Sequence, residues 1–249
     1  MARVSAIEWT EATWNPWHGC RRVSPGCAHC YMYREKRQYG QDPTHVLRSK
    51  TTFDSPLKWR EPRMVFTCSW SDFFIEDADE WREEAWKVIK ETPHHTYQIL
   101  TKRPERIAAT LPAGWPWPNV WLGVSVENPR FYWRIATLEQ TAAAVRFLSL
   151  EPLLAPMADL PLRGITWVIV GGESGPGCRP IRPEWVRQIR DQCTRTRVPF
   201  FFKQWGGVRK ERNGRILEGK VWNEMPAETV GGLANQVRHA LSSIDRSCS

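Results

Sequence analysis

The sequence contains no apolar run approaching the roughly 20 residues that a membrane-spanning helix needs. Its first residues do not combine a positively charged stretch with an apolar core, so they do not resemble a secretory leader. It also lacks an internal repeat at a fixed period and any low-complexity tract. These absences predict a cytoplasmic globular protein with no membrane partner, in a compartment where thiols stay reduced.

The composition is that of an ordinary globular chain with two excesses, positive charge and tryptophan. With 249 residues, of which 41% are hydrophobic and 25% charged, the chain is long enough for one large domain. A formal net charge of +8 favours a polyanionic partner, nucleic acid ahead of an acidic membrane, although a basic surface also serves solubility alone. The 15 tryptophans supply core but also suit base-stacking surfaces.

Short apolar runs, rich in β-branched and aromatic residues and barely alternating, are typical of strands buried on both faces. They occupy residues 64–69, 97–102, 120–127, 145–151, 167–173 and 198–204. Helical patterns fall at 31–37, 79–91, 104–111, 130–141 and 183–195. A further strand is expected just before the first cysteines. This alternation predicts an α/β fold, a complete or partial (β/α) TIM-type barrel.

The pattern of strands and helices ends soon after the last apolar run. We therefore expect a barrel domain over residues 1–207 and a C-terminal extension over 208–249. Residues 209–215 are expected to form a charged hairpin or loop. The remainder is expected to be a poorly structured tail or a short closing helix.

Polar side chains gather where the predicted strands end. They are Ser69, Ser71, Asp72, Thr101, Lys102, Ser125, Glu127, Glu151, Glu173, Ser174, Lys203 and Gln204. The active sites of (β/α) barrels lie at the carboxyl ends of the strands. Each residue taken singly is also compatible with a loop or a helix cap, but the set predicts a site at this face.

Three of the seven cysteines, Cys20, Cys27 and Cys30, lie on one loop with the spacing C-x6-C-x2-C. Thiolates are soft ligands that favour zinc, copper(I) or iron–sulfur clusters. No fourth cysteine lies beside them, which predicts a metal centre with one open position. The alternative is structural zinc, with His18, His29 or Cys68 as the fourth ligand.

This loop resembles that of the radical S-adenosylmethionine enzymes, which carry three cysteines early in a (β/α) barrel with a helix directly after them. Their usual spacing is C-x3-C-x2-C, often with an aromatic residue before the last cysteine. Here the second gap matches, His29 takes the aromatic place, and the first gap is six residues. The resemblance implies a barrel of the radical S-adenosylmethionine kind.

The chain also resembles a phage-associated three-cysteine-motif family and, more distantly, spore photoproduct lyase. The matching segments are WNPWHGC at 14–20, LTKRP at 100–104, SLEPLL at 149–154, GGESG at 171–175 and FFKQWG at 201–206. Phage association would place the protein in the host cytoplasm.

The resemblance implies that Cys20, Cys27 and Cys30 bind three irons of a [4Fe-4S] cluster. The fourth iron would chelate the amino and carboxylate groups of S-adenosylmethionine. One electron, from a donor such as flavodoxin or ferredoxin, would cleave this cofactor to methionine and a 5′-deoxyadenosyl radical. The radical would then abstract a hydrogen atom from the substrate.

The resemblance also implies roles for the polar strand ends. Ser69, Ser71 and Asp72 would contact the methionine moiety, although the Gly-Gly-Glu sequence usual there is absent. Ser125 and Glu127 would bind ribose hydroxyls, and Gly171, Gly172 and Glu173 would pass close to adenine. Thr101, Lys102, Glu151 and Lys203 would face the substrate or the cofactor carboxylate. Cys68 would be a hydrogen-atom donor or an ordinary buried cysteine.

These observations together predict a radical enzyme acting on a nucleic-acid base or modified nucleotide, as in the hypermodification of phage DNA. Whether the reaction is an isomerisation, a lysis or a transfer is open. One alternative is a non-catalytic, zinc-stabilised nucleic-acid-binding protein. Another is a radical enzyme acting on a peptide or small metabolite.

Overall fold

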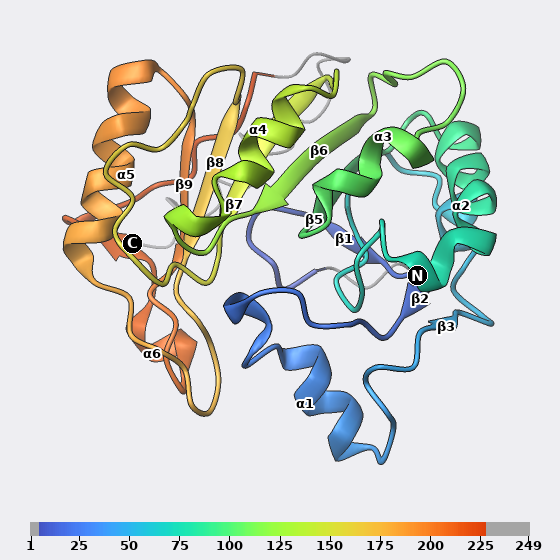
Figure 1. Cartoon of the computed structure of the whole chain (residues 1–249), viewed down its shortest axis with the longest axis horizontal. Helices are drawn as coiled ribbons and strands as arrows, with labels where there is room; N and C mark the ends of the chain where they lie inside the picture. Colours follow the sequence, from blue (N-terminus) through green and yellow to red (C-terminus); the bar gives the residue numbers. More distant parts are fainter. Residues whose placement is uncertain (1–4, 228–249) are drawn as a thin grey trace, which may run out of the picture.

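Seven parallel strands form one curved sheet in the computed structural model, which describes residues 5–227. They are β1 (Ala12–Trp14), β4 (Met64–Thr67), β5 (Thr96–Thr101), β6 (Val120–Ser125), β7 (Val145–Leu150), β8 (Trp167–Gly171) and β9 (Phe200–Gln204), in the order β1-β4-β5-β6-β7-β8-β9. The sheet is curled, and within the described residues its edge strands β1 and β9 do not pair, so it forms an open half-barrel (Figure 1). The predicted α/β fold is confirmed in its partial form.

Helices on the convex face separate most of the strands. They are α2 (Asp79–Glu91), α3 (Ile107–Thr110), α4 (Trp133–Glu139) and α5 (Pro183–Thr196) (Figure 1). Short 3-10 turns at Ser55–Lys58, Glu76–Ala78, Pro104–Arg106 and Pro129–Phe131 complete the connections. The predicted helix at 104–111 is thus a 3-10 turn leading into α3, and the one at 130–141 is a similar turn followed by α4.

Helix α2 shows how sequence sets these elements. Its buried residues Ala85, Trp86 and Ile89 recur at helical spacing on the face toward the sheet. Asp79 and Glu80 lie in its first turn and Lys90 in its last, which complements the helix dipole. The prediction of residues 79–91 as helical is confirmed.

Hydrophobic side chains fill both faces of the sheet. The larger cluster joins the sheet to the helices and includes Trp14, Trp86 and Ile189. The second lies on the opposite face, where Trp9 packs against Phe66, Phe147 and Trp167. Apolar burial therefore closes part of the concave side and leaves the carboxyl ends of the strands to the polar residues.

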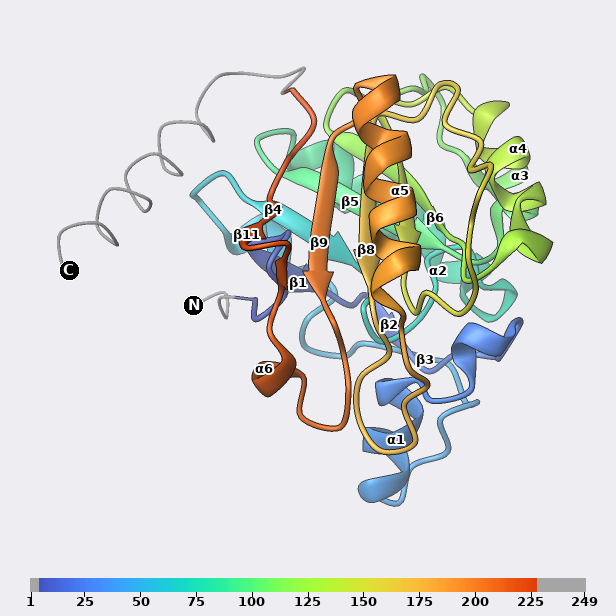
Figure 2. The ribbon, with the colours of Figure 1, turned by 90° about the vertical axis from the view of Figure 1, so that its left-hand side faces the viewer.

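The cysteine loop and the helix that follows it lie at the carboxyl end of the sheet. The loop runs from β2 (Trp17–His18), which pairs with β3 (Leu47–Arg48), through a 3-10 turn at Pro25–Cys27 to α1 (Tyr31–Gln38). Figures 1 and 2 both place α1 beyond the ends of the strands. The strand predicted before the cysteines is β1, and the helix predicted at 31–37 is α1.

The segment after β9 returns along the edge of the sheet. It contains α6 (Lys210–Asn213) and a hairpin of β10 (Ile216–Leu217) and β11 (Lys220–Val221). The amide of Phe202 donates to the carbonyl of Trp222, so the segment partly covers β9. The expected loop at 209–215 is largely helix α6. The tail or closing helix expected after it begins instead with the hairpin of β10 and β11, and its residues 228–249 lie outside the described residues. No helix in residues 5–227 is long and apolar enough to cross a membrane.

We expect Trp167→Ala to lower the free energy of unfolding by about 3–5 kcal/mol, because it removes a fully buried ring and leaves a cavity. The matched control is Trp133→Ala, since Trp133 is 45% exposed; its effect should stay within about 0.5 kcal/mol. Urea unfolding measures both. Equal decreases would contradict the assignment of the concave core.

Candidate functional site

The three cysteines of the predicted metal site line one cavity of about 710 Å³ at the carboxyl end of the half-barrel. Cys20, Cys27 and Cys30 are all free thiols and partly buried. Most of the predicted strand-end residues line the same cavity: Cys68, Ser69, Ser71, Asp72, Thr101, Lys102, Ser125, Glu151, Gly172, Glu173, Ser174, Lys203 and Gln204. The fold therefore brings the cysteine loop and the polar strand ends together.

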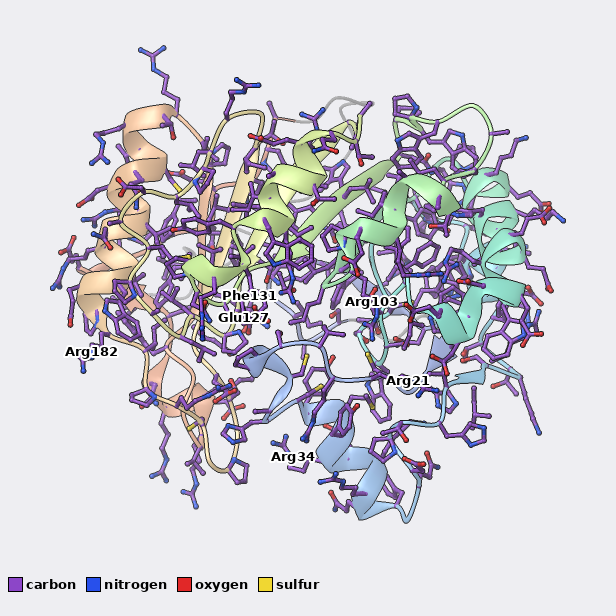
Figure 3. All side chains as sticks on the ribbon, viewed as in Figure 1. Arg21, Arg34, Arg103, Glu127, Phe131 and Arg182 are labelled. Atoms are coloured by element: carbon purple, nitrogen blue, oxygen red, sulfur yellow. The ribbon has the colours of Figure 1, made fainter. Side chains whose placement is uncertain are left out.

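Glu127, predicted to bind ribose, lies beneath the cysteine loop and is completely buried. Its carboxylate accepts a 2.5 Å hydrogen bond from Ser24 Oγ and pairs with Arg134 Nη1 at 3.0 Å. A Cβ on Gly26 would come within 2.3 Å of Glu127 Oε1, so only glycine permits this close approach. Glu127 thus fastens the loop to β6 (Figure 3).

Asp72 forms a second contact between the strand ends and the cysteine loop, through Arg103, which follows β5. Asp72 Oδ2 lies 3.3 Å from Arg103 Nη1, and Arg103 Nη2 donates to the carbonyl of Arg21 at 2.9 Å. Nearby, Ser71 Oγ donates to the carbonyl of Gly19 at 2.5 Å. The first cysteine is therefore held from both sides by the ends of β4 and β5.

Glu173, which follows β8, forms the third contact between the strand ends and the cysteine loop. Its Oε2 lies 2.9 Å from His29 Nδ1 and accepts from the backbone amide of Arg179 at 2.8 Å. The side chain of Arg179 also pairs with Glu173 and donates to the carbonyl of Pro25 at 2.9 Å. Burial alone would raise the pKa of Glu173, but these hydrogen bonds outweigh burial and lower the pKa to about 2.

Two tyrosines of α1 attach the helix, one to the end of β4 and the other to the cysteine loop, and neither was predicted as a site residue. The hydroxyl of Tyr31 donates to the carbonyl of Ser69, and that of Tyr33 donates to the carbonyl of Cys20. Tyr31 also lines the cavity. Their position directly after Cys30 was the available signal, but their carbonyl partners are set by the tertiary fold.

The cavity contains an ion pair that fastens no part of the cysteine loop. Lys203 Nζ lies 2.8 and 3.0 Å from the two oxygens of Glu151. Gln204 Nε2 donates to Glu151 Oε1 at 3.2 Å and to Ser174 Oγ at 2.8 Å. Both members of this pair line the cavity.

Several hydroxyls of the cavity remain available. Among the described residues, no protein partner bonds to the hydroxyls of Ser125, Ser149 or Thr13, and all three residues line the cavity. By contrast, Ser69 Oγ is engaged by Asn15, and Thr101 Oγ1 donates to Asp72. Of the residues predicted to bind ribose, Ser125 has a hydroxyl available for a ligand.

Gly171 and Gly172, predicted to lie close to adenine, allow other parts of the protein to pack closely at the end of β8. A Cβ on Gly172 would lie 2.1 Å from the carbonyl oxygen of Trp205, so the loop after β9 depends on this glycine. A Cβ on Gly171 would lie 3.1 Å from the carboxyl carbon of Glu151. Gly172 therefore permits the close approach of the Trp205 backbone, and Gly171 that of the Glu151 carboxylate.

Cys68 is almost fully buried and has a left-handed φ of 64°, which is uncommon outside glycine. Burial raises the pKa of its thiol well above the ordinary value, so it is protonated at neutral pH. Burial likewise raises the pKa of Cys20 to about 12, to which the negative charge of Asp72 adds. Any metal held by Cys20 as a thiolate would therefore have to displace this proton.

The donor set fits an iron–sulfur cluster. Three cysteine thiols face one cavity, and a cluster takes each thiolate on a different iron. Within residues 5–227 no three His, Cys, Asp or Glu side chains converge closely enough to hold a single metal ion.

The low pKa of Glu173 predicts a pH-dependent stability. The group stabilises the fold above its unfolded pKa, near the ordinary value of 4.5, and this contribution is lost as pH falls toward the folded value of about 2. The stability difference between wild type and Glu173→Gln should shrink by up to about 1.4 kcal/mol per pH unit below the unfolded pKa. Urea unfolding from about pH 6 to about pH 3 measures it.

Glu61→Gln is the control, because Glu61 is an exposed loop residue with no ion pair among the described residues. Its difference from wild type should stay constant with pH. A constant difference for Glu173→Gln as well would contradict the fastening role.

No curated protein and no solved structure matches the chain significantly. A family model described as "Protein of unknown function (DUF5131)" matches residues 4–226, and the chain belongs to this family.

Proposed function

We propose that the protein is a radical S-adenosylmethionine enzyme. The observation that carries the proposal is the placement of Cys20, Cys27 and Cys30 on one loop, facing a cavity whose other walls are polar strand ends of a parallel half-barrel. These three thiolates would hold a [4Fe-4S] cluster, which supplies one-electron cleavage of S-adenosylmethionine when bound. The protein's own task is to orient the reactants and exclude water.

The cavity offers matching groups for the second cofactor. Lys203 and Glu151 carry opposite charges side by side, which suits the carboxylate and ammonium of an amino-acid moiety. Ser125 supplies a free hydroxyl for a ribose. Lys102 lines the same cavity and keeps its proposed role toward methionine or substrate. The hydroxyls of Ser69, Ser71 and Thr101 bond to Asn15, the Gly19 carbonyl and Asp72, so their proposed role is to shape the cavity wall.

We propose a nucleic-acid base or modified nucleotide as the substrate. Basic side chains lie on two segments at the carboxyl end of the sheet, Arg34 and Arg37 on α1 and Arg209, Lys210 and Arg212 at α6. None of them forms an ion pair with a carboxylate in the described part of the chain, although Glu35 and Glu211 lie in the same segments.

Two of these cations are near the cavity itself. Arg34 and Lys210 line it, and Figure 2 shows α1 and α6 at the same end of the sheet. Unpaired cations around a cavity suit the phosphates of a nucleic acid whose base enters the site. The resemblance to a phage-associated family and to spore photoproduct lyase supports DNA hypermodification as the setting.

Anaerobic reconstitution tests the cofactor. We expect about four irons and four sulfides per chain, and 5′-deoxyadenosine after reduction with dithionite in the presence of S-adenosylmethionine. Cys27→Ala should lose most of the iron, because one of three ligands is gone. Cys178→Ala, which changes a partly buried cysteine outside the loop, should retain it. One tightly bound zinc in place of iron would overturn the proposal.

Salt-dependent binding of a DNA oligonucleotide tests the substrate class. The double variant Arg34→Ser/Lys210→Ser should weaken binding and reduce the slope of log K against log salt by about 1 for each phosphate that the protein no longer neutralises. Lys90→Ser, on the exposed surface of α2, removes a charge away from the cavity and should leave the slope unchanged. Fluorescence anisotropy between about 50 and 200 mM salt measures this. No binding by the wild type would favour a peptide or small metabolite.

A further inference from the structure

Arg103 is a buried cation between the sheet and the cysteine loop, with only 5% of its side chain exposed. Its Nη2 donates to the carbonyl of Arg21 at 2.9 Å, and its Nη1 lies 3.3 Å from Asp72 Oδ2. Nη1 also donates to Cys20 Sγ at 3.9 Å. Figure 3 shows the side chain near the end of β5, beside the loop.

The surroundings hold this guanidinium in one place. The Arg103 amide donates to Thr101 Oγ1 at 2.9 Å, and Thr101 Oγ1 donates to Asp72 Oδ1 at 2.7 Å. The amides of Phe74 and Lys102 donate to the Asp72 carboxylate at 3.0 and 2.9 Å. The bond to sulfur therefore comes from a donor whose direction is already fixed by its neighbours.

The three cysteine sulfurs differ in what surrounds them. The sulfur of Cys27 has a neutral neighbour, Ser24 Oγ, at 3.8 Å. In residues 5–227 no side-chain donor contacts the sulfur of Cys30. Among the three loop cysteines, as far as residues 5–227 show, only Cys20 has a sulfur that accepts a hydrogen bond from a cationic side chain.

We propose that Arg103 is a positioning residue that raises the reduction potential of the cluster through its hydrogen bond to Cys20. This inference rests on the proposed function. One-electron reduction by the external electron donor adds one negative charge beside the sulfurs, and a nearby cation with an N–H donor stabilises that charge. Because the pair lies in a buried environment, solvent screens the interaction little.

A purely structural role for Arg103 gives a different expectation. If the residue only fastened the loop through Asp72 and the Arg21 carbonyl, its removal would change stability or cluster content but not the potential of the cluster that assembles. The potential therefore separates the two roles.

The test is a redox titration of the reconstituted protein, followed by the electron paramagnetic resonance signal of the reduced cluster. Arg103→Met should shift the midpoint potential to a more negative value. Arg103→Lys keeps the charge without the forked donor and should shift it less. Arg106→Met is the matched control and should keep the wild-type potential. Arg106 lies on the turn that follows Arg103, pairs with Asp79 at the start of α2 and contacts no cysteine sulfur among the described residues.

Arg103→Met also leaves Asp72 without its cation, so the double variant Arg103→Met/Asp72→Asn is included. The double variant is compared with Asp72→Asn, which lacks the same negative charge: a more negative potential in the double variant supports the bond to sulfur, whereas equal potentials overturn the inference. A wild-type potential in Arg103→Met also overturns it. If Arg103→Met assembles no cluster, the potential of Arg103→Lys is used instead: a more negative value supports the inference, and the wild-type value overturns it.

Failure of the proposed function is recognised separately. The wild-type protein is reconstituted first, and absence of iron and sulfide there refutes the cluster itself. A wild-type cluster with an unshifted potential in the Arg103 variants refutes only this inference.

Discussion

The site depends on charged contacts that hold the cysteine loop to the ends of the strands. Asp72 acts through Arg103, Glu127 bonds to Ser24, and Glu173 bonds to His29. Each carboxylate is buried and multiply hydrogen-bonded, so removing one partner would leave an uncompensated charge. The loop has little regular structure of its own, and these contacts define where its three thiols lie.

This arrangement divides the polar strand ends into two groups. One group is committed to the loop and is unavailable to a ligand. The other faces the cavity and includes the Glu151–Lys203 pair and the free hydroxyls of Ser125 and Ser149. The half-barrel thus provides a rigid support for the cysteine loop and, beside it, polar groups placed along the wall of the cavity.

Much of the fold followed from local patterns, because buried parallel strands and α2 carry their signals within a few residues. The gathering of strand-end residues in one place also followed, since parallel strands share their carboxyl edge. Their partners did not follow. Glu127 bonds to Ser24, which is 103 positions away in the sequence. Arg103 and Arg179 donate to carbonyls of the cysteine loop, and only the tertiary fold brings these groups together. Spacing alone could not separate a ligand-binding carboxylate from one that supports a loop.

The central claim is that the three cysteines hold a cluster with one iron open to S-adenosylmethionine. Electron paramagnetic resonance of the anaerobically reduced protein, with and without S-adenosylmethionine, tests it most directly. The account predicts a reduced-cluster signal whose g values change when S-adenosylmethionine is added. A protein that contains zinc and gives no signal, or a signal that S-adenosylmethionine leaves unchanged, would contradict it.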